Sequence, residues 1–218
     1  MSSTRAWLDS FVSQNALLVA TAGGRVATPL AACSPPTFSP QSVVSVGTNP
    51  NSVAFEDFNG DGSTDMAVVL NGANAISIRL GDGAGAFGPA IDYAVGVSPQ
   101  FAVTEDFNRD GKPDLAVANA GSNSISVLLG NGAGGFSTTN SVPAGPVPFG
   151  LAVGSFNRSV DLDQNLDLVV TNLQSNTVMI LLGDGAGGFG PPASFPVGLA
   201  PDFVAVGDFD GDLNLDVA

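Results

Sequence analysis

The 218-residue sequence contains no histidine, one cysteine, one tryptophan, one tyrosine and only six basic residues. Without histidine, the chain cannot build a Ser–His–Asp or Cys–His triad, nor a zinc or iron site with histidine ligands. Cys33 alone cannot form an internal disulfide or a cysteine-based metal site. The net charge of −14 provides no basic surface for phosphate groups, so we expect no nucleic-acid partner.

The sequence also lacks long apolar runs and capped, apolar-periodic helices. No apolar run approaches the roughly 18 residues of a membrane-spanning helix, so we do not expect an integral membrane protein. Serine and aspartate remain as potential catalytic groups, but no base–nucleophile pairing is evident, so we expect no enzyme. The 28 glycines indicate many tight turns and, with the missing helical periodicity, predict an all-β fold.

An acidic motif returns at intervals of about 49 residues. EDFNGDGSTDMAVVLN at 56–71 is followed by EDFNRDGKPDLAVANA at 105–120. GSFNRSVDLDQNLDLVVTN at 154–172 carries four extra residues, and GDFDGDLNLDVA at 207–218 begins a fourth copy. The repetition predicts a fold built from equivalent units.

One period contains four short segments typical of β-strands, PQFAVTEDF, DLAVAN, SISVLLGN and FSTTNSVPAG, separated by Gly, Asn and Asp turns. Four short strands repeated every 40 to 50 residues are typical of a β-propeller blade of four antiparallel strands. The expected organisation is an N-terminal segment 1–16, a degenerate partial blade 17–40, blades at 41–89, 90–138 and 139–191, and a partial blade 192–218.

A glycine-rich motif, GDGAGAFGP and its variants, keeps the same period. A phosphate-binding loop would need a following helix and usually a lysine, and neither is present. We therefore expect a turn between the third and fourth strands, with the phenylalanine that ends each motif packed between blades. These residues are Phe87, Phe136 and Phe189.

The acidic loops carry Asp or Asn at relative positions 1, 3, 5 and 9 and, in the first two copies, glycine at position 6. Oxygen ligands at alternating positions, with a backbone carbonyl at position 7, suit Ca²⁺, and the glycine permits the sharp turn around the ion. The expected calcium residues are Asp57, Asn59, Asp61, Ser63 and Asp65; Asp106, Asn108, Asp110, Lys112 and Asp114; Asn157, Asp163, Asn165 and Asp167; and Asp208, Asp210, Asp212, Asn214 and Asp216.

Two of these loops depart from the pattern. The third has Ser155 at position 1 and the four-residue insertion, within which Asp161 is a substitute ligand, and the fourth has Leu213 in place of glycine. Strands flank the loops and position 12 is apolar (Val68, Val117), which excludes an EF-hand. The alternative interpretation is a set of Asp/Asn/Gly turns without an ion.

The two motifs D-F-N-x-D-G-x-x-D-L-A-V and L-G-D/N-G-x-G-x-F, recurring in phase over residues 38–218, resemble FG-GAP/VCBS-type repeats such as those of integrin α-chain propellers. The resemblance implies a β-propeller, usually of seven blades, with structural calcium in the acidic loops. It also implies an extracellular or cell-envelope protein that serves adhesion or the binding of a protein or carbohydrate. The alternatives are a lectin-like propeller and an accessory domain of a larger secreted enzyme.

The number of blades has two interpretations. Seven blades of this length would need roughly 340 residues, so the chain would be part of a larger propeller. Alternatively, residues Phe203–Asp216 complete the N-terminal blade and close a four-bladed ring. An open propeller leaves apolar blade faces exposed and is expected to self-associate.

Two features bear on location. The sequence LAAC at 30–33 is similar to a bacterial lipoprotein cleavage site, with Cys33 as the lipid-bearing residue, although a degenerate blade explains the same residues. Millimolar calcium outside cells saturates weak calcium sites, which favours an extracellular or cell-envelope location.

Overall fold

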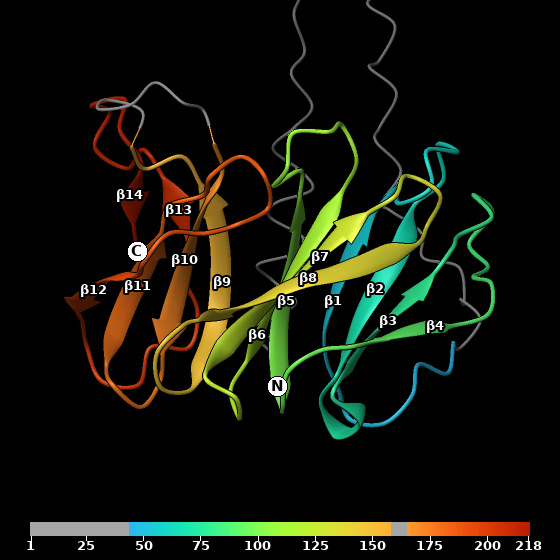
Figure 1. Cartoon of the computed structure of the whole chain (residues 1–218), viewed down its shortest axis with the longest axis horizontal. Helices are drawn as coiled ribbons and strands as arrows, with labels where there is room; N and C mark the ends of the chain where they lie inside the picture. The colour runs from blue at the N-terminus through green and yellow to red at the C-terminus, as the bar shows by residue number, and fades with distance from the viewer. Residues whose placement is uncertain (1–43, 158–164) are drawn as a thin grey trace, which may run out of the picture. The chain divides into compact units, whose positions relative to one another are not determined.

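The computed structural model describes residues 44–157 and 165–218, which belong to one compact unit, Gln41–Ala218 (Figure 1). It contains three four-stranded antiparallel sheets and one two-stranded sheet. The strands are β1 (Pro50–Glu56), β2 (Asp65–Leu70), β3 (Ala75–Arg79) and β4 (Ile91–Ala94); β5 (Pro99–Glu105), β6 (Asp114–Asn119), β7 (Ser124–Gly130) and β8 (Phe136–Pro143); β9 (Pro148–Gly154), β10 (Asp167–Asn172), β11 (Thr177–Leu181) and β12 (Ala193–Pro196); and β13 (Val206–Gly207) and β14 (Asp216–Val217).

The predicted blade architecture is confirmed. Each four-stranded sheet is a meander in which every strand pairs antiparallel with the next along the chain, and one 3-10 helix, η1 (Asn71–Ala73), is the only helical element of the described residues. No helical element in that part of the chain has the length and apolarity to cross a membrane.

The sheets end later than the repeat boundaries that we expected at residues 89, 138 and 191. The fourth strands β4 and β12 lie after the first and third of these boundaries, and β8 spans the second. The expected boundaries follow the glycine-rich motif, which is the turn that leads into the fourth strand. Each blade therefore extends to the end of the strand that follows this motif.

The second strand of each sheet lies at its centre and is buried on both faces. All six residues of β2, β6 and β10 are buried. Continuous apolar runs such as DLAVAN suit this position because alternate side chains point to opposite faces of the sheet. In β6, Leu115 and Val117 enter the core with the first sheet, and Ala116 and Ala118 enter the core with the third sheet.

Consecutive sheets pack face to face through apolar side chains. The core between the first and second sheets contains Phe58, Ala67, Val69, Ile76, Ile78, Ala102, Leu115, Val117 and Leu128. The core between the second and third sheets contains Phe107, Ala116, Ala118, Ile125, Val127, Val142, Ala144, Leu151, Leu168, Val170 and Leu181. These blades bury their faces against one another, as expected of propeller repeats.

A phenylalanine from each of the first two acidic loops reaches into the next blade. Phe58 packs edge-to-face on Phe136, with ring centroids 5.3 Å apart, and Phe107 packs on Phe189 at 5.7 Å. The backbone N–H of Gly134 donates to the carbonyl of Phe58 at 3.0 Å. The predicted packing of the glycine-rich motif's phenylalanine between blades is thereby confirmed for Phe136 and Phe189.

Glycine is required in this turn because a leucine of the preceding blade lies against it. A Cβ atom on Gly134 would lie 2.7 Å from Cδ2 of Leu80, and one on Gly187 would lie 2.8 Å from Cδ2 of Leu129. Both glycines have positive φ angles of 78° and 82°. The motif therefore forms both the turn and part of the contact between blades.

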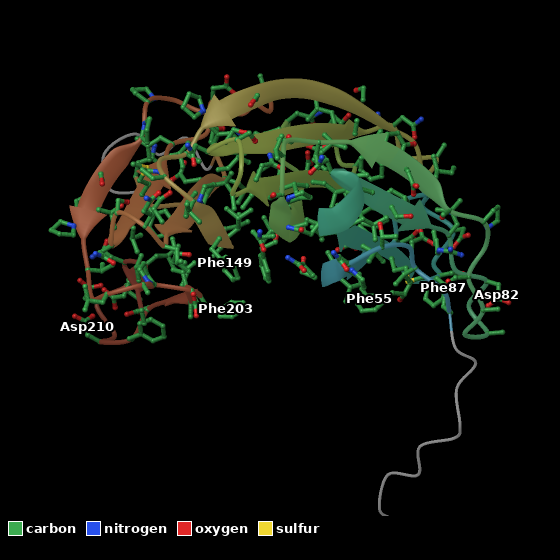
Figure 2. All side chains as sticks on the ribbon, turned by 90° about the horizontal axis from the view of Figure 1, so that it is seen from below. Phe55, Asp82, Phe87, Phe149, Phe203 and Asp210 are labelled. Carbon is green, nitrogen blue, oxygen red and sulfur yellow. The ribbon has the colours of Figure 1, made fainter. Side chains whose placement is uncertain are left out.

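The segment that leads to β13 and β14 packs on the preceding sheets. Thr171 donates its hydroxyl to the carbonyl of Asp202 at 3.1 Å. The ring of Phe203 lies edge-to-face against Phe101 and Phe149, with centroids 5.9 and 6.1 Å away (Figure 2). The two-stranded sheet is thus attached as the beginning of a fourth blade.

Candidate metal centres

The acidic loops connect the first strand of each blade to the second. The structure describes the whole of the loops 57–65, 106–114 and 208–216, and both ends of the third loop. Asp161 and Asp163 of the third loop lie outside the described residues. The three complete loops share one pattern of hydrogen bonds, which fixes the positions of their side-chain oxygen atoms.

The carboxylate at position 1 accepts hydrogen bonds from the backbone of its own loop. Asp57 accepts the N–H groups of Gly60 at 2.8 Å, Asp61 at 3.2 Å and Gly62 at 2.7 Å. Asp208 accepts the three equivalent N–H groups of its loop, and Asp106 accepts those of Asp110 and Gly111. These bonds wind the chain around the position-1 side chain, as an ion-binding loop requires.

Positions 3 and 5 continue this pattern. Asn59 accepts the N–H of Asp61 at 2.9 Å, and Asp61 accepts the N–H of Ser63 at 2.7 Å. The side chain of Asn59, followed by the backbone of Ser63, holds the pKa of Asp61 below its usual value. Asn214 has the same effect on the pKa of Asp212. These carboxylates are therefore ionised at neutral pH, the form that binds cations.

In the second loop a lysine is the cation nearest to the position-5 carboxylate. The Nζ of Lys112 lies 3.0 Å from Oδ2 of Asp110 and lowers the pKa of that carboxyl. Both side chains are partly exposed, so the pair contributes little to stability. The sequence predicted only a carbonyl role for Lys112, and its ammonium group is an additional charge at this loop.

The aspartate at position 9 has a structural role that the sequence did not reveal. Asp65 is fully buried. One of its oxygens accepts the N–H of Phe58 at 2.9 Å, and the other accepts the N–H of Gly81 at 2.7 Å. Asp114 and Asp167 make the equivalent bonds to Phe107 and Gly130 and to Phe156 and Gly183. This carboxylate joins the acidic loop to the glycine-rich turn within each blade.

The first glycine of the glycine-rich motif permits this bond. A Cβ atom on Gly81 would overlap the carbonyl oxygen of Thr64, and the same overlap would arise between Gly130 and Pro113. Any side chain would push the turn away from the residue that precedes the position-9 aspartate. The only sequence signal of this contact is that the two motifs recur in the same phase.

The fourth loop brings three carboxylates together. Asp208, Asp210 and Asp216 each offer an oxygen atom within 4.8 Å of the others, and no other group of three acids is so placed in the described ranges. Two oxygen ligands of one Ca²⁺ lie at most about 5.2 Å apart, because each binds at about 2.3–2.6 Å. The donor set of this loop therefore fits calcium. The first two loops have asparagine at position 3, so they contain one acid fewer.

Of the third loop, the structure describes the two ends, 155–157 and 165–167. Asn157 is buried, and Asp167 occupies the structural position 9. The side chain of Asn165 accepts a hydrogen bond from Arg109 of the preceding blade at 3.3 Å and donates to the carbonyl of Gly183. Asn165 therefore also links the third loop to its neighbour.

The backbone conformation at position 6 explains why glycine is preferred there. Gly62 and Gly111 adopt φ angles of 84° and 80°, and Leu213 in the fourth loop has φ = 71°. A non-glycine residue in this region costs about 1–2 kcal/mol.

We predict that Leu213→Gly raises the free energy of unfolding by about 1 kcal/mol, because it relieves this strain. The Leu213 side chain is 90% exposed, so its removal costs little packing. Urea denaturation in EDTA measures the effect without calcium. The control is Leu199→Gly, which removes an equally exposed leucine whose φ is not positive and should not stabilise.

The four-stranded blades and their repeated acidic loops define a β-propeller repeat protein. The sequence profile of FG-GAP-like repeats matches residues 106–158 and 160–218, and the chain belongs to this family. No relative was found among curated proteins.

Solved structures share the fold. A protein of unknown function from Desulfotomaculum acetoxidans DSM 771 matches with a TM-score of 0.58 and 21% identity, over 74% of this chain and 46% of that one. BBS1N in complex with ARL6DN matches with a TM-score of 0.54 and 17% identity, over 80% and 50%. The Pseudomonas aeruginosa periplasmic gluconolactonase PpgL matches with a TM-score of 0.54 and 18% identity, over 78% and 43%. The chain thus spans about half the length of these structures.

Proposed function

We propose that the chain is a calcium-stabilised β-propeller module that acts as a non-catalytic binding scaffold outside the cell or in the cell envelope. The observation that carries the calcium proposal is the group Asp208, Asp210 and Asp216, whose carboxylate oxygens lie within 4.8 Å of one another. Like charges at this distance repel one another, and a divalent cation would remove that repulsion. The shared hydrogen-bond pattern extends the proposal to the first two loops.

The charge of the whole chain supports a structural role for the ion. The sequence has 20 acidic and six basic residues, and Lys112–Asp110 is the one salt bridge found within the described segments. The repeated carboxylates therefore have few protein cations to neutralise them. The first two loops also hold the phenylalanines that pack on the next blade, so an ion bound in these loops would stabilise the contacts between blades.

A scaffold function is supported by the repetition of the acidic loops. A catalytic carboxylate pair acts at one place, whereas these acids recur once per blade. The alternative of a lectin would need aromatic surfaces open to a sugar. Tyr93, the chain's single tyrosine, packs edge-to-face on Phe136 and accepts the N–H of that residue at 3.2 Å, so its ring is part of a blade contact. Tyr93 therefore offers no open ring for a sugar to stack on.

Titration calorimetry of Ca²⁺ into EDTA-stripped protein tests the proposal. We expect at least two sites, each of which adds about 1.4 kcal/mol to the free energy of unfolding when free calcium is tenfold above its Kd. Asp210→Ala, which removes one of the three grouped carboxylates, should weaken or remove one site. Asp82→Asn, which changes an exposed acid of the glycine-rich motif, should leave the titration unchanged. No binding heat and no change in melting temperature would show that the loops are turns without an ion.

A further inference from the structure

One face of the first sheet carries an open apolar groove of about 360 Å³. Its apolar lining includes Val46, Val53, Phe55, Met66 and Val68. Val53 is 48% exposed and Phe55 is 54% exposed. Strand pairing opposes Val53 to Val68 and Phe55 to Met66, so these four side chains share one face of the sheet.

This face is equivalent to one that is buried in the next blade. Met66 and Val68 occupy the positions that Leu115 and Val117 hold in the second sheet. Leu115 and Val117 are fully buried in the core between the first and second sheets. On the second and third sheets the equivalent surface is covered by the preceding blade. On the first sheet this surface forms the groove.

Part of that cover is present on the first sheet. Val44 and Val46, like Phe87, pack against the cluster of Met66, Val68 and Leu70. They stand 49 residues before Tyr93 and Val95, which pack into the core between the first and second sheets. The described residues thus supply the outer edge of a covering blade, whereas the inner part of the groove stays open.

The fourth acidic loop carries the opposite half of such a contact. Phe209 is equivalent to Phe58 and Phe107, which are 1% and 3% exposed because each inserts against the next blade. Phe209 is 61% exposed. On a following blade, Phe209 would pack on the phenylalanine of the glycine-rich turn. In the first blade that phenylalanine is Phe87, which lies beside the groove.

We propose that Phe209 of one copy inserts into the first-sheet groove of a second copy, beside Phe87, and that the second copy does the same in return. The result is a dimer with two identical head-to-tail contacts. By analogy with the bond between Gly134 and Phe58, the N–H of Gly85 would donate to the carbonyl of Phe209 across each contact.

Two observations favour a second copy as the occupant. Figure 2 shows Asp210, next to Phe209, and Phe87 at opposite ends of the row of sheets, so Phe209 does not reach the groove of its own chain in this structure. The two surfaces are also the two halves of one repeated contact, which Phe58 and Phe107 make with Phe136 and Phe189 between neighbouring blades.

Sedimentation equilibrium of the full chain in calcium tests the proposal. We expect a mass of twice 21.7 kDa. Phe209→Gln and Val53→Gln should each raise the dimer dissociation constant by about tenfold or more, because each places an unpaired amide in an apolar contact. Both residues are well exposed in the single chain, so circular dichroism should show that the variants still fold.

The matched control is Ile91→Gln. Ile91 is 48% exposed, as Val53 is, but it pairs with Ile78 and so lies on the opposite face of the same sheet. This variant should keep the wild-type mass. A wild-type mass of 21.7 kDa, or any mass other than twice that value, would overturn the proposal. A dimer that resists both groove and loop variants, or that Ile91→Gln weakens equally, would overturn it too.

Discussion

Replacing Asp114 with alanine is expected to lower the free energy of unfolding by about 3–5 kcal/mol, because each buried donor left without an acceptor costs about 1–3 kcal/mol. The Asp114 carboxylate is fully buried and accepts the N–H groups of Phe107 at 3.0 Å, Asn108 at 3.3 Å and Gly130 at 2.8 Å. Burial raises the pKa of this carboxyl, and the three amides oppose that rise. Urea denaturation of the wild type and the variant measures the difference in their free energies of unfolding.

The urea denaturation of Asp114→Ala should be carried out in EDTA, because position 9 is also a proposed calcium position. In EDTA the loss reports only the hydrogen bonds between the acidic loop and the glycine-rich turn. The control is Asp82→Ala. Asp82 is an exposed carboxylate that also accepts two backbone N–H groups, from Ala84 and Ala86, and its removal should leave the midpoint near that of the wild type because water replaces it. A loss below about 1 kcal/mol at Asp114 would contradict the structural role of this residue.

The strands could be predicted from the sequence because their signals are local. PQFAVTEDF and DLAVAN differ in pattern, and the structure makes them β5 at one edge and β6 in the buried interior of the same sheet. Each is bounded by Gly, Asn or Asp, which favour turns. Repetition at a fixed period then predicted that neighbouring blades pack alike, and the contacts at Phe136 and Phe189 confirm it.

The role of the position-9 aspartate could not be predicted in this way. Asp65 and Gly81 are 16 residues apart, and only the pairing of β2 with β3 brings them within 2.7 Å. In the sequence, Asp65 is one of several acids with the spacing of a calcium loop. What distinguishes it from Asp57 and Asp61 is its complete burial, which depends on the neighbouring strands. The calcium pattern and the buried hydrogen bonds use the same residue.

This shared residue connects the candidate metal centre to the packing of blades. In the first blade, the Asp65 carboxylate holds the N–H of Phe58, and the carbonyl of Phe58 accepts the N–H of Gly134 in the second blade. The Phe58 ring enters the core between the two sheets. A change in the acidic loop therefore reaches the next blade through one side chain and one peptide group. We expect calcium and blade packing to stabilise each other for this reason.

Phe58→Ala is expected to lower the free energy of unfolding by about 3–5 kcal/mol, the usual cost of removing a buried phenylalanine. Phe58 is 1% exposed and contacts Phe136 edge-to-face, so the substitution removes both buried area and an aromatic pair. The control is Phe195→Ala in β12, where the ring is half exposed and a much smaller loss is expected.

The number of unfolding transitions in Phe58→Ala is as informative as the midpoint of unfolding. Because β6 contributes to the cores on both of its faces, we expect Phe58→Ala to shift one cooperative transition that circular dichroism and urea-gradient electrophoresis report alike. Two separate transitions would mean that the first sheet unfolds by itself and that Phe58 does not couple it to the second. An equal loss in Phe58→Ala and Phe195→Ala would contradict the specific role of the loop phenylalanine, since the two residues differ mainly in burial between blades.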